Sequence, residues 1–203
     1  IRAAKAAVES EIAKVQPEVD YLRAIRAALP DDGFFLTELC QAGFASYFAW
    51  DARQPRTYVS EGYQGTLGYG FPTALGVKVA NPDRKVVAVC GDGGFMFGVQ
   101  ELATAVQEGI GVVVVMFDNG AYGNVRRDQR TRFEGRFIAS ELRNPDFLKL
   151  ANAFDVEAHT VRSPTELAAV LPAALAAEQT VIVHVAVPPD SEASPWPFIH
   201  PAP

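Results

Sequence analysis

The chain has 203 residues, of which 49% are hydrophobic and 21% charged, a composition typical of a globular protein with a sizeable core. Its formal net charge of −6, with no cluster of lysine and arginine, argues against a nucleic-acid-binding surface. The two cysteines make no disulfide framework, the longest apolar run (112–117) is too short for a membrane span and no signal peptide is visible, so we expect a cytoplasmic protein.

The beginning of the chain is predicted to be helical. In residues 1–16 apolar side chains recur at spacings of three and four, which predicts a helical arm that Pro17 stops. Residues 18–29 show a second pattern of this kind. Because the chain opens with Ile1 inside the first pattern, without a methionine or a helix cap, we expect it to be a piece of a longer polypeptide.

Strands and helices alternate after this start. A polar turn is expected at 37–43 and a glycine-rich segment at 61–70. The basic stretch 126–130 is interrupted by Asp128 and is expected to be a solvated loop. The predicted elements, in chain order, are strand 34–39, strand 56–60, helix 72–80, strand 86–90, helix 99–108 and strand 112–117.

Two helix starts are predicted in the last third of the chain. Asn144 before Pro145 is typical of one, with a side-chain cap and a proline at the first helical position. Ser163 and Glu166 form a capping box that opens another helix, in which Pro172 is expected to cause a kink or an early end. The remaining predicted strands are 156–161 and 181–187.

This alternation predicts a doubly wound α/β fold, a mostly parallel sheet with helices on both faces. Residues 86–90 and 112–117 show no polar alternation, as expected for strands that are buried on both faces. We expect three parts along the chain, which are a linker arm (1–17), one domain (18–190) and an extended proline-rich tail (191–203).

Two of these strands end in polar, glycine-rich turns. Asp92 follows the first strand and Asn119 follows the second. Ligands of open α/β sheets bind at the carboxyl ends of the strands, so both side chains are expected at one rim. A carboxylate and an amide oxygen suit Mg²⁺, while the glycines at 91, 93 and 94 leave N–H groups open to a phosphate at a helix start. A plain helix cap at Asp92 and a plain turn residue at Asn119 are the alternatives.

Gly91-Asp92-Gly93 with Asp118-Asn119 resembles the diphosphate-anchoring motif of thiamine diphosphate (ThDP) enzymes. The resemblance extends to Gly65-Thr66-Leu67-Gly68-Tyr69-Gly70-Phe71-Pro72 and to Gln100-Glu101-Leu102-Ala103-Thr104-Ala105, which look like the acetolactate synthase and benzoylformate decarboxylase group. It covers residues 18–188 and implies the ThDP-binding fold.

The resemblance also implies roles for single residues. It gives the metal a third ligand, the main-chain carbonyl of Ala121. It places the Gly65 carbonyl on the amino group of the cofactor's pyrimidine, and Leu67 beneath the bent cofactor, where an intramolecular base comes close to the thiazolium carbon. Leu67 as a plain core residue is the alternative. The residues expected to bind the cofactor are Gln41, Gly65, Leu67, Gly91, Asp92, Gly93, Gly94, Phe95, Asn119 and Tyr122.

Three positions depart from the family pattern. Asp118 stands where the family has asparagine, and it either adds negative charge near the metal or holds the turn by hydrogen bonds. Gly94 stands where several relatives have serine, so a hydroxyl contact is lost. Asp128 stands where acetohydroxyacid synthases have tryptophan, which argues against their specificity for the second keto acid.

The function that the resemblance implies is that of a C-terminal domain, in a ThDP- and Mg²⁺-dependent decarboxylase or carboligase of small 2-oxo acids. In this family the activating glutamate belongs to a separate pyrimidine-binding domain, so no catalytic residue is expected here. A homo-oligomer is expected, because an apolar cluster lies beside the site, unless that cluster fills the core. Its members are Phe71, Phe95, Met96 and Phe97.

Two other functions stay open. The chain could be a separate β-type subunit of a two-chain decarboxylase, or a non-catalytic module that binds Mg²⁺ and diphosphate. The three histidines do not separate these alternatives, because His159, His184 and His200 are expected to be structural or solvated.

Overall fold

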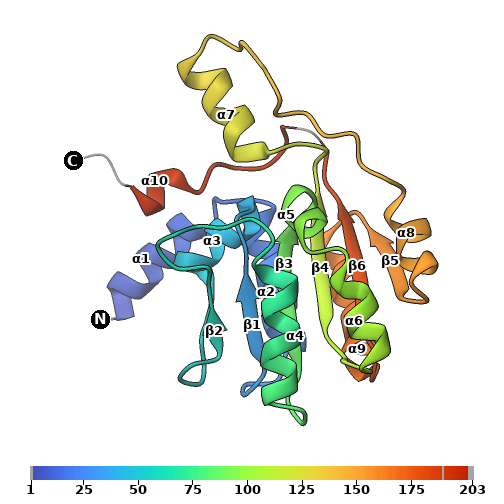
Figure 1. Ribbon diagram of the computed structural model, residues 1–203. Helices are drawn as coiled ribbons and strands as arrows, with labels where there is room; N and C mark the ends of the chain where they lie inside the picture. The colour runs from blue at the N-terminus through green and yellow to red at the C-terminus, as the bar shows by residue number, and fades with distance from the viewer. Residues whose placement is uncertain (1, 189, 201–203) are drawn as a thin grey trace.

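The computed structural model describes residues 2–188 and 190–200. Its centre is one six-stranded sheet in the order β2-β1-β3-β4-β6-β5 (Figure 1). All neighbouring strands run parallel, which confirms the doubly wound α/β fold. The strands are β1 (Phe34–Thr37), β2 (Tyr58–Val59), β3 (Val86–Gly91), β4 (Val113–Asp118), β5 (Glu157–Val161) and β6 (Val181–Ala186).

Helices cover both faces of this sheet. Buried residues of α2, α3 and α9 pack on one face, and those of α4, α5, α6 and α8 pack on the other. The helices are α1 (Arg2–Ile12), α2 (Glu18–Ala28), α3 (Gln41–Ala49), α4 (Gly70–Ala80), α5 (Asp92–Phe97), α6 (Glu101–Gln107), α7 (Gly123–Arg132), α8 (Phe147–Ala153), α9 (Pro164–Ala176) and α10 (Trp196–Ile199).

The central strands are buried from both sides, as predicted. In β3, Val87 and Val89 contribute to one core, while Ala88 and Cys90 contribute to the other. Successive side chains of a strand point to opposite faces, so a strand between two helical layers must be apolar at every position. The same alternation in β4 fixes its register against β3 and thereby fixes where the two strands end.

Two helices within the expected domain 18–190 were not predicted. α3 lies where a polar turn was expected, and its sequence is apolar on all sides, so it carries no stripe with helical spacing. α7 includes the stretch that was expected to be a loop, and none of its residues is buried. Periodicity could not find either helix.

Three details of the C-terminal part also differ from the predictions. Asp146, and not Asn144, caps α8, since its side chain accepts hydrogen bonds from Leu148 N and Lys149 N. α9 continues past Pro172 to Ala176, so the expected early end is wrong. The tail, expected to be extended throughout, contains α10 (Trp196–Ile199), while residues 201–203 lie outside the described residues.

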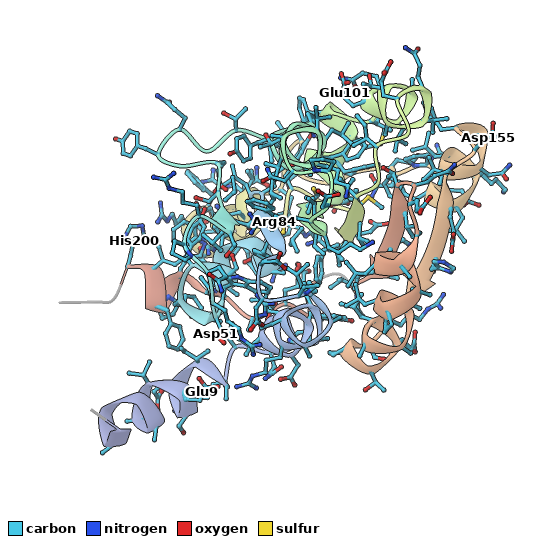
Figure 2. All side chains as sticks on the ribbon, turned by 90° about the horizontal axis from the view of Figure 1, so that it is seen from below. Glu9, Asp51, Arg84, Glu101, Asp155 and His200 are labelled. Carbon is cyan, nitrogen blue, oxygen red and sulfur yellow. The ribbon has the colours of Figure 1, made fainter. Side chains whose placement is uncertain are left out.

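The expected apolar cluster beside the site divides into two pairs. Phe71 and Phe95 are buried in the core, with ring centroids 5.6 Å apart, so they are not surface residues. Met96 and Phe97 are exposed, Phe97 by 59%. Figures 1 and 2 show that α1, which carries Glu9, extends outward from the sheet, while Glu9 pairs with Arg23 of α2 at 2.5 Å. Within residues 2–188 and 190–200, no helix has both the length and the apolar character that crossing a bilayer requires.

Glu18, the first residue of α2, is an unusual core residue. It is 1% exposed, and neither carboxylate oxygen has a hydrogen-bond partner within the described part of the chain. Burial, with a contribution from the nearby Glu192 carboxyl, raises the pKa of Glu18 from 4.5 to about 7, although the main-chain N–H groups of Glu18 and Ala193 lower it. Below pH 4.5 the group is protonated in both the folded and the unfolded states, so it then imposes no ionisation cost on folding.

We predict that Glu18 lowers the free energy of unfolding as the pH rises from 4.5 to about 7, because only the unfolded chain ionises freely in that window. The cost at pH 8 is on the order of 3 kcal/mol. Glu18→Gln should therefore stabilise the protein at pH 8 and much less at pH 4.5, as measured by urea unfolding. The exposed Glu11→Gln is the control. An equal effect of Glu18→Gln at both pH values would contradict this prediction.

Candidate functional site

A cavity of about 170 Å³ lies at the carboxyl end of the sheet. Its walls come from the segments that follow β1, β3 and β4, and β1 and β3 lie where the strand order changes direction. This is the place where open α/β sheets bind their ligands. The lining residues predicted from the sequence are Gln41, Leu67, Gly91, Asp92, Gly93, Gly94, Asn119, Ala121 and Tyr122.

Two of the expected cofactor residues lie elsewhere. The side chain of Phe95 is in the core, 1% exposed, and does not line the cavity. Gly65 belongs to the same turn as Leu67 but is not among the lining residues. Gln41 lines the cavity from the first turn of α3, and not from a loop.

The cavity wall favours an anion. The first residues of α3, α5 and α7 all line it, and the N-terminus of a helix carries partial positive charge and free N–H groups. Backbone approaches closely here, because a Cβ on Gly93 would lie 2.6 Å from the Tyr122 ring and one on Gly94 would lie 1.9 Å from Glu38 Oε1. Only glycine fits at both positions in this backbone, because any side chain would collide with Tyr122 or Glu38.

Two carboxylates meet at the ends of β3 and β4. Asp92 Oδ2 and Asp118 Oδ1 both accept from Gly120 N, at 3.1 and 3.0 Å, and from Asn144 Nδ2, at 2.6 and 2.7 Å. His184 Nε2 lies 2.9 Å from Asp118 Oδ2. The structure thus shows Asp118 holding the turn by hydrogen bonds, one of its two expected roles, and it gives His184 a structural contact.

The two carboxylates titrate differently. Burial raises the pKa of Asp92 to about 6, the hydrogen bond from Asn144 lowers it and the charge of Asp118 raises it. Burial alone would raise the pKa of Asp118, but the hydrogen bonds from His184 and Asn144 hold it below its usual value. Asp92 is therefore the member of the pair whose charge is least compensated by the protein.

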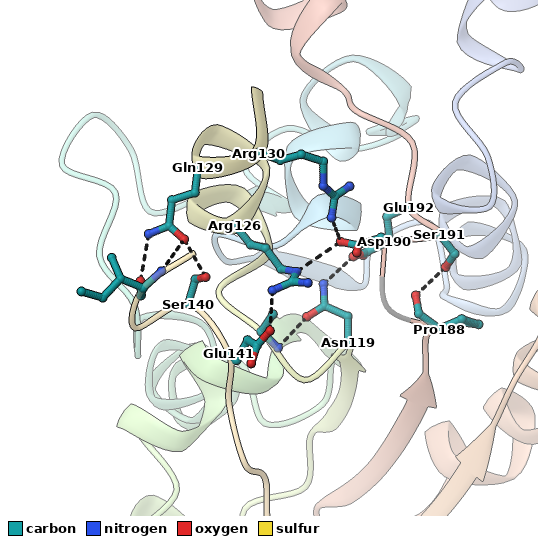
Figure 3. Close-up of polar contacts among 12 residues, drawn as sticks. Asn119, Arg126, Gln129, Arg130, Ser140, Glu141, Pro188, Asp190, Ser191 and Glu192 are labelled. Carbon is teal, nitrogen blue, oxygen red and sulfur yellow. Dashed lines mark hydrogen bonds and ion pairs between the residues drawn. The ribbon is translucent and has the colours of Figure 1, made fainter. Parts of the chain in front are cut away.

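Asn119 is held from two sides. Its Oδ1 accepts from Ala121 N at 3.1 Å, and its Nδ2 donates to Glu192 Oε2 at 2.5 Å (Figure 3). Glu192 belongs to the C-terminal segment and also lines the cavity. Burial raises the pKa of Glu192 to about 7, although the Asn119 hydrogen bond lowers it. A second acidic side chain, besides Asp92, therefore lines the same cavity, and no sequence pattern predicted it.

A second cavity, of about 490 Å³, shares Gln41, Asn119 and Ala121 with the first. Ion pairs surround it, since Arg126 contacts both Glu141 (2.8 Å) and Asp190 (3.4 Å). Arg130 also pairs with Asp190 (Figure 3). The two pairs with Asp190 join α7 to the C-terminal segment, and the pair with Glu141 joins it to the loop that follows α7.

The oxygen atoms at this site suit a hard cation only if carboxylate, amide and main-chain oxygens are combined. Within the described residues, no group of three or more His, Cys, Asp or Glu is arranged to hold a metal. The predicted set instead combines the Asp92 carboxylate, the Asn119 amide oxygen and the Ala121 carbonyl, and oxygen ligands completed by water and phosphate are what Mg²⁺ prefers. The buried Gln41 Oε1, which has no hydrogen-bond partner among the described residues, is a further polar atom that could bind a ligand at this site.

Asn144 is a site residue that sequence reasoning placed wrongly. It was expected to cap a helix, but its side chain bridges Asp92 and Asp118. The only signal was Asp146, an equally good cap two residues later, which would have freed Asn144 for another role.

Fold and cavity together define an α/β domain that binds an anionic cofactor at the switch point of a parallel sheet. Residues 40–185 match the family model described as thiamine pyrophosphate enzyme, C-terminal TPP binding domain. The chain belongs to this family, as the motifs around Asp92 and Asn119 predicted.

Several relatives agree with this assignment. The chain is 38% identical to a probable acetolactate synthase large subunit of Methanococcus aeolicus over 155 residues, 76% of this chain and 26% of the relative. It is 37% identical to a probable 2-ketoarginine decarboxylase of Pseudomonas aeruginosa over 147 residues, 72% of this chain and 26% of the relative. A solved thiamine diphosphate-dependent 4-hydroxybenzoylformate decarboxylase of Rhodococcus jostii superposes with a TM-score of 0.78 at 28% identity, covering 86% of this chain and 33% of that one.

We predict that Asn144→Ala destabilises the protein by about 1–3 kcal/mol, because it removes the shared donor from two adjacent carboxylates. Thermal unfolding at pH 7 measures the loss. The exposed Asn152→Ala, on α8, is the matched control and should stay within about 0.5 kcal/mol of wild type. Equal effects of the two variants would show that the bridge contributes nothing.

Proposed function

We propose that this chain is the diphosphate- and Mg²⁺-binding part of a ThDP-dependent enzyme that decarboxylates or joins small 2-oxo acids. The observation that supports this most is the convergence of Asp92, Asn119 and Ala121 on one cavity that Gly93 and Gly94 also line. Membership of the ThDP enzyme family and the activities for which the relatives are named support the reaction class.

Each residue has a distinct part in this proposal. Asp92, Asn119 and the Ala121 carbonyl bind Mg²⁺, and Asp118 positions the turn that carries two of them. The N–H groups around Gly93 bind the phosphates. The other proposed cofactor contacts are the N–H groups of Gly91 and Gly94, the side chains of Gln41, Leu67 and Tyr122, the backbone around Phe95 and the carbonyl of Gly65.

ThDP, when bound, supplies the carbon nucleophile that attacks the keto group of the substrate. The protein's part is to orient and to stabilise. Asp92 has a pKa raised by burial, and a divalent cation beside it would compensate its charge and favour the carboxylate. An ionised Glu192 would repel the diphosphate, so we propose that its contact with Asn119 is exchanged when the cofactor binds.

The proposal includes a partner domain. The chain spans 26% of the length of the acetolactate synthase relative, so a pyrimidine-binding domain in the same enzyme is consistent with that size difference. The exposed Met96 and Phe97 lie beside the site and suit contact with such a domain or with a second copy. The cytoplasmic location and the homo-oligomer stay predictions, as does the division of the chain into arm, domain and tail.

We predict that pyrophosphate and ThDP bind to this chain only in the presence of Mg²⁺, and that Asp92→Ala abolishes this binding. The physical reason is that Asp92 supplies the one carboxylate of the proposed ligand set. Calorimetry with Mg²⁺ and then with EDTA measures it, with the exposed Asp83→Ala as control. Binding that is unchanged by EDTA would contradict the assignment of a Mg²⁺ site to these residues. Equal affinity for ThDP and pyrophosphate would favour a plain diphosphate-binding module.

We predict that the chain folds but has no measurable decarboxylase activity by itself, because the proposed partner domain carries the activating glutamate. Pure protein is incubated with ThDP, Mg²⁺ and pyruvate or benzoylformate, and released CO₂ is measured. Turnover under these conditions would show that the chain holds a complete active site.

A further inference from the structure

Glu38 is a buried carboxylate that the proposed function has not used. It follows β1 directly and is 1% exposed. Its Oε1 accepts from Gly68 N at 2.7 Å, and its Oε2 accepts from Gly70 N at 2.7 Å. One side chain thus binds two main-chain N–H groups of the glycine-rich segment, which is about 30 residues away in sequence.

The segment that Glu38 holds contains Leu67. Gly65 and Gly68 flank it with φ values of +58° and +82°, a backbone shape that other residues rarely adopt. A Cβ on Gly68 would also lie 2.8 Å from Phe97 Cβ, so the segment passes close to α5. Leu67 is the one residue of this segment that lines the cavity.

Glu38 also lies against the start of α5 at Gly93 and Gly94, here called the diphosphate turn because the proposed function assigns the phosphates to it. The position of a Cβ on Gly94 is 1.9 Å from Glu38 Oε1 and 3.5 Å from Leu67 Cδ2. The carboxylate therefore stands between the two glycine-rich segments, one after β3 and one before α4. It also explains Gly94 structurally, because a serine there would collide with Glu38 in this backbone.

A simple helix cap does not account for this arrangement. A carboxylate at the start of α4 would need to bind only the helical N–H of Gly70, but Glu38 also binds Gly68, which precedes the helix. Packing alone does not account for it either. An apolar side chain fills space without the desolvation cost of a buried charge, and that cost is offset only if both hydrogen bonds form.

We propose that Glu38 is a positioning residue, which fixes Leu67 over the diphosphate turn by binding the N–H groups of Gly68 and Gly70. This rests on the proposed function, because it concerns the contact of Leu67 with the organic part of ThDP. Glu38 itself touches neither the phosphates nor Mg²⁺. Its loss should weaken the binding of ThDP and leave the binding of pyrophosphate unchanged.

The experiment compares wild type with Glu38→Gln and Glu38→Asp. Glutamine keeps the shape but turns an N–H group toward a main-chain N–H, and aspartate keeps the charge but is one methylene too short. The exposed Glu178→Gln is the matched control. Amide hydrogen exchange of residues 65–70 is measured together with the affinities for ThDP and for pyrophosphate, both with Mg²⁺.

For Glu38→Gln we expect exchange at Gly68 and Gly70 to be about tenfold faster and ThDP affinity to be about tenfold lower, as the loss of one buried hydrogen bond implies. Pyrophosphate affinity should stay within about twofold of wild type, as should every property of the control. If Glu38→Gln fails to fold, Glu38→Asp is expected to give the same pattern.

Three results would overturn the inference. These are unchanged exchange at Gly68 and Gly70, equal losses of ThDP and pyrophosphate affinity, or the failure of both variants to fold, which would make Glu38 a purely structural residue. A wild-type chain that binds no pyrophosphate with Mg²⁺ would instead refute the proposed function and remove the basis of a role for Leu67. Faster exchange would then show only that Glu38 anchors the segment.

Discussion

The site depends on one electrostatic constraint, the meeting of two carboxylates at the ends of neighbouring parallel strands. Register between β3 and β4 places Asp92 and Asp118 side by side, where the charge of Asp118 raises the cost of ionising Asp92. Asn144 and the N–H of Gly120 compensate part of that charge and, in doing so, fix the path of the loop after β4. The charge that remains uncompensated is the charge that the proposed Mg²⁺ would neutralise.

The constraint works because the sheet beneath it is rigid. Alternate side chains of β3 and β4 enter two separate cores, so neither strand can slide without exposing one complete set of apolar side chains. Loops that end on such strands are placed to within the precision of the packing. Asp92 and Asn119 follow these strands directly, so their positions are set by the sheet. Asn144 and Glu192, which come from segments more distant in the sequence, bind to them.

Sequence patterns were sufficient to predict the parallel sheet and the edge of the sheet at which Asp92 and Asn119 lie, because both follow from local periodicity. An unbroken apolar run predicts a doubly covered strand, and the residue after it is at the sheet's end. The roles of Asn144, Glu38 and Glu192 depend on contacts across 26 to 73 positions, which no local pattern encodes. α3 and α7 were missed for opposite reasons, since one is apolar on every side and the other buries nothing.

The ion pairs of α7 have a mechanical consequence. With no buried side chain, α7 has little hydrophobic attachment of its own, and Arg126 and Arg130 tie it to Asp190 on the C-terminal segment. That segment in turn reaches the site through Glu192 and Asn119. Dissolved salt screens exposed charges but does not weaken apolar cores. Added salt should therefore weaken the ion pairs between α7 and the C-terminal segment before it affects the sheet.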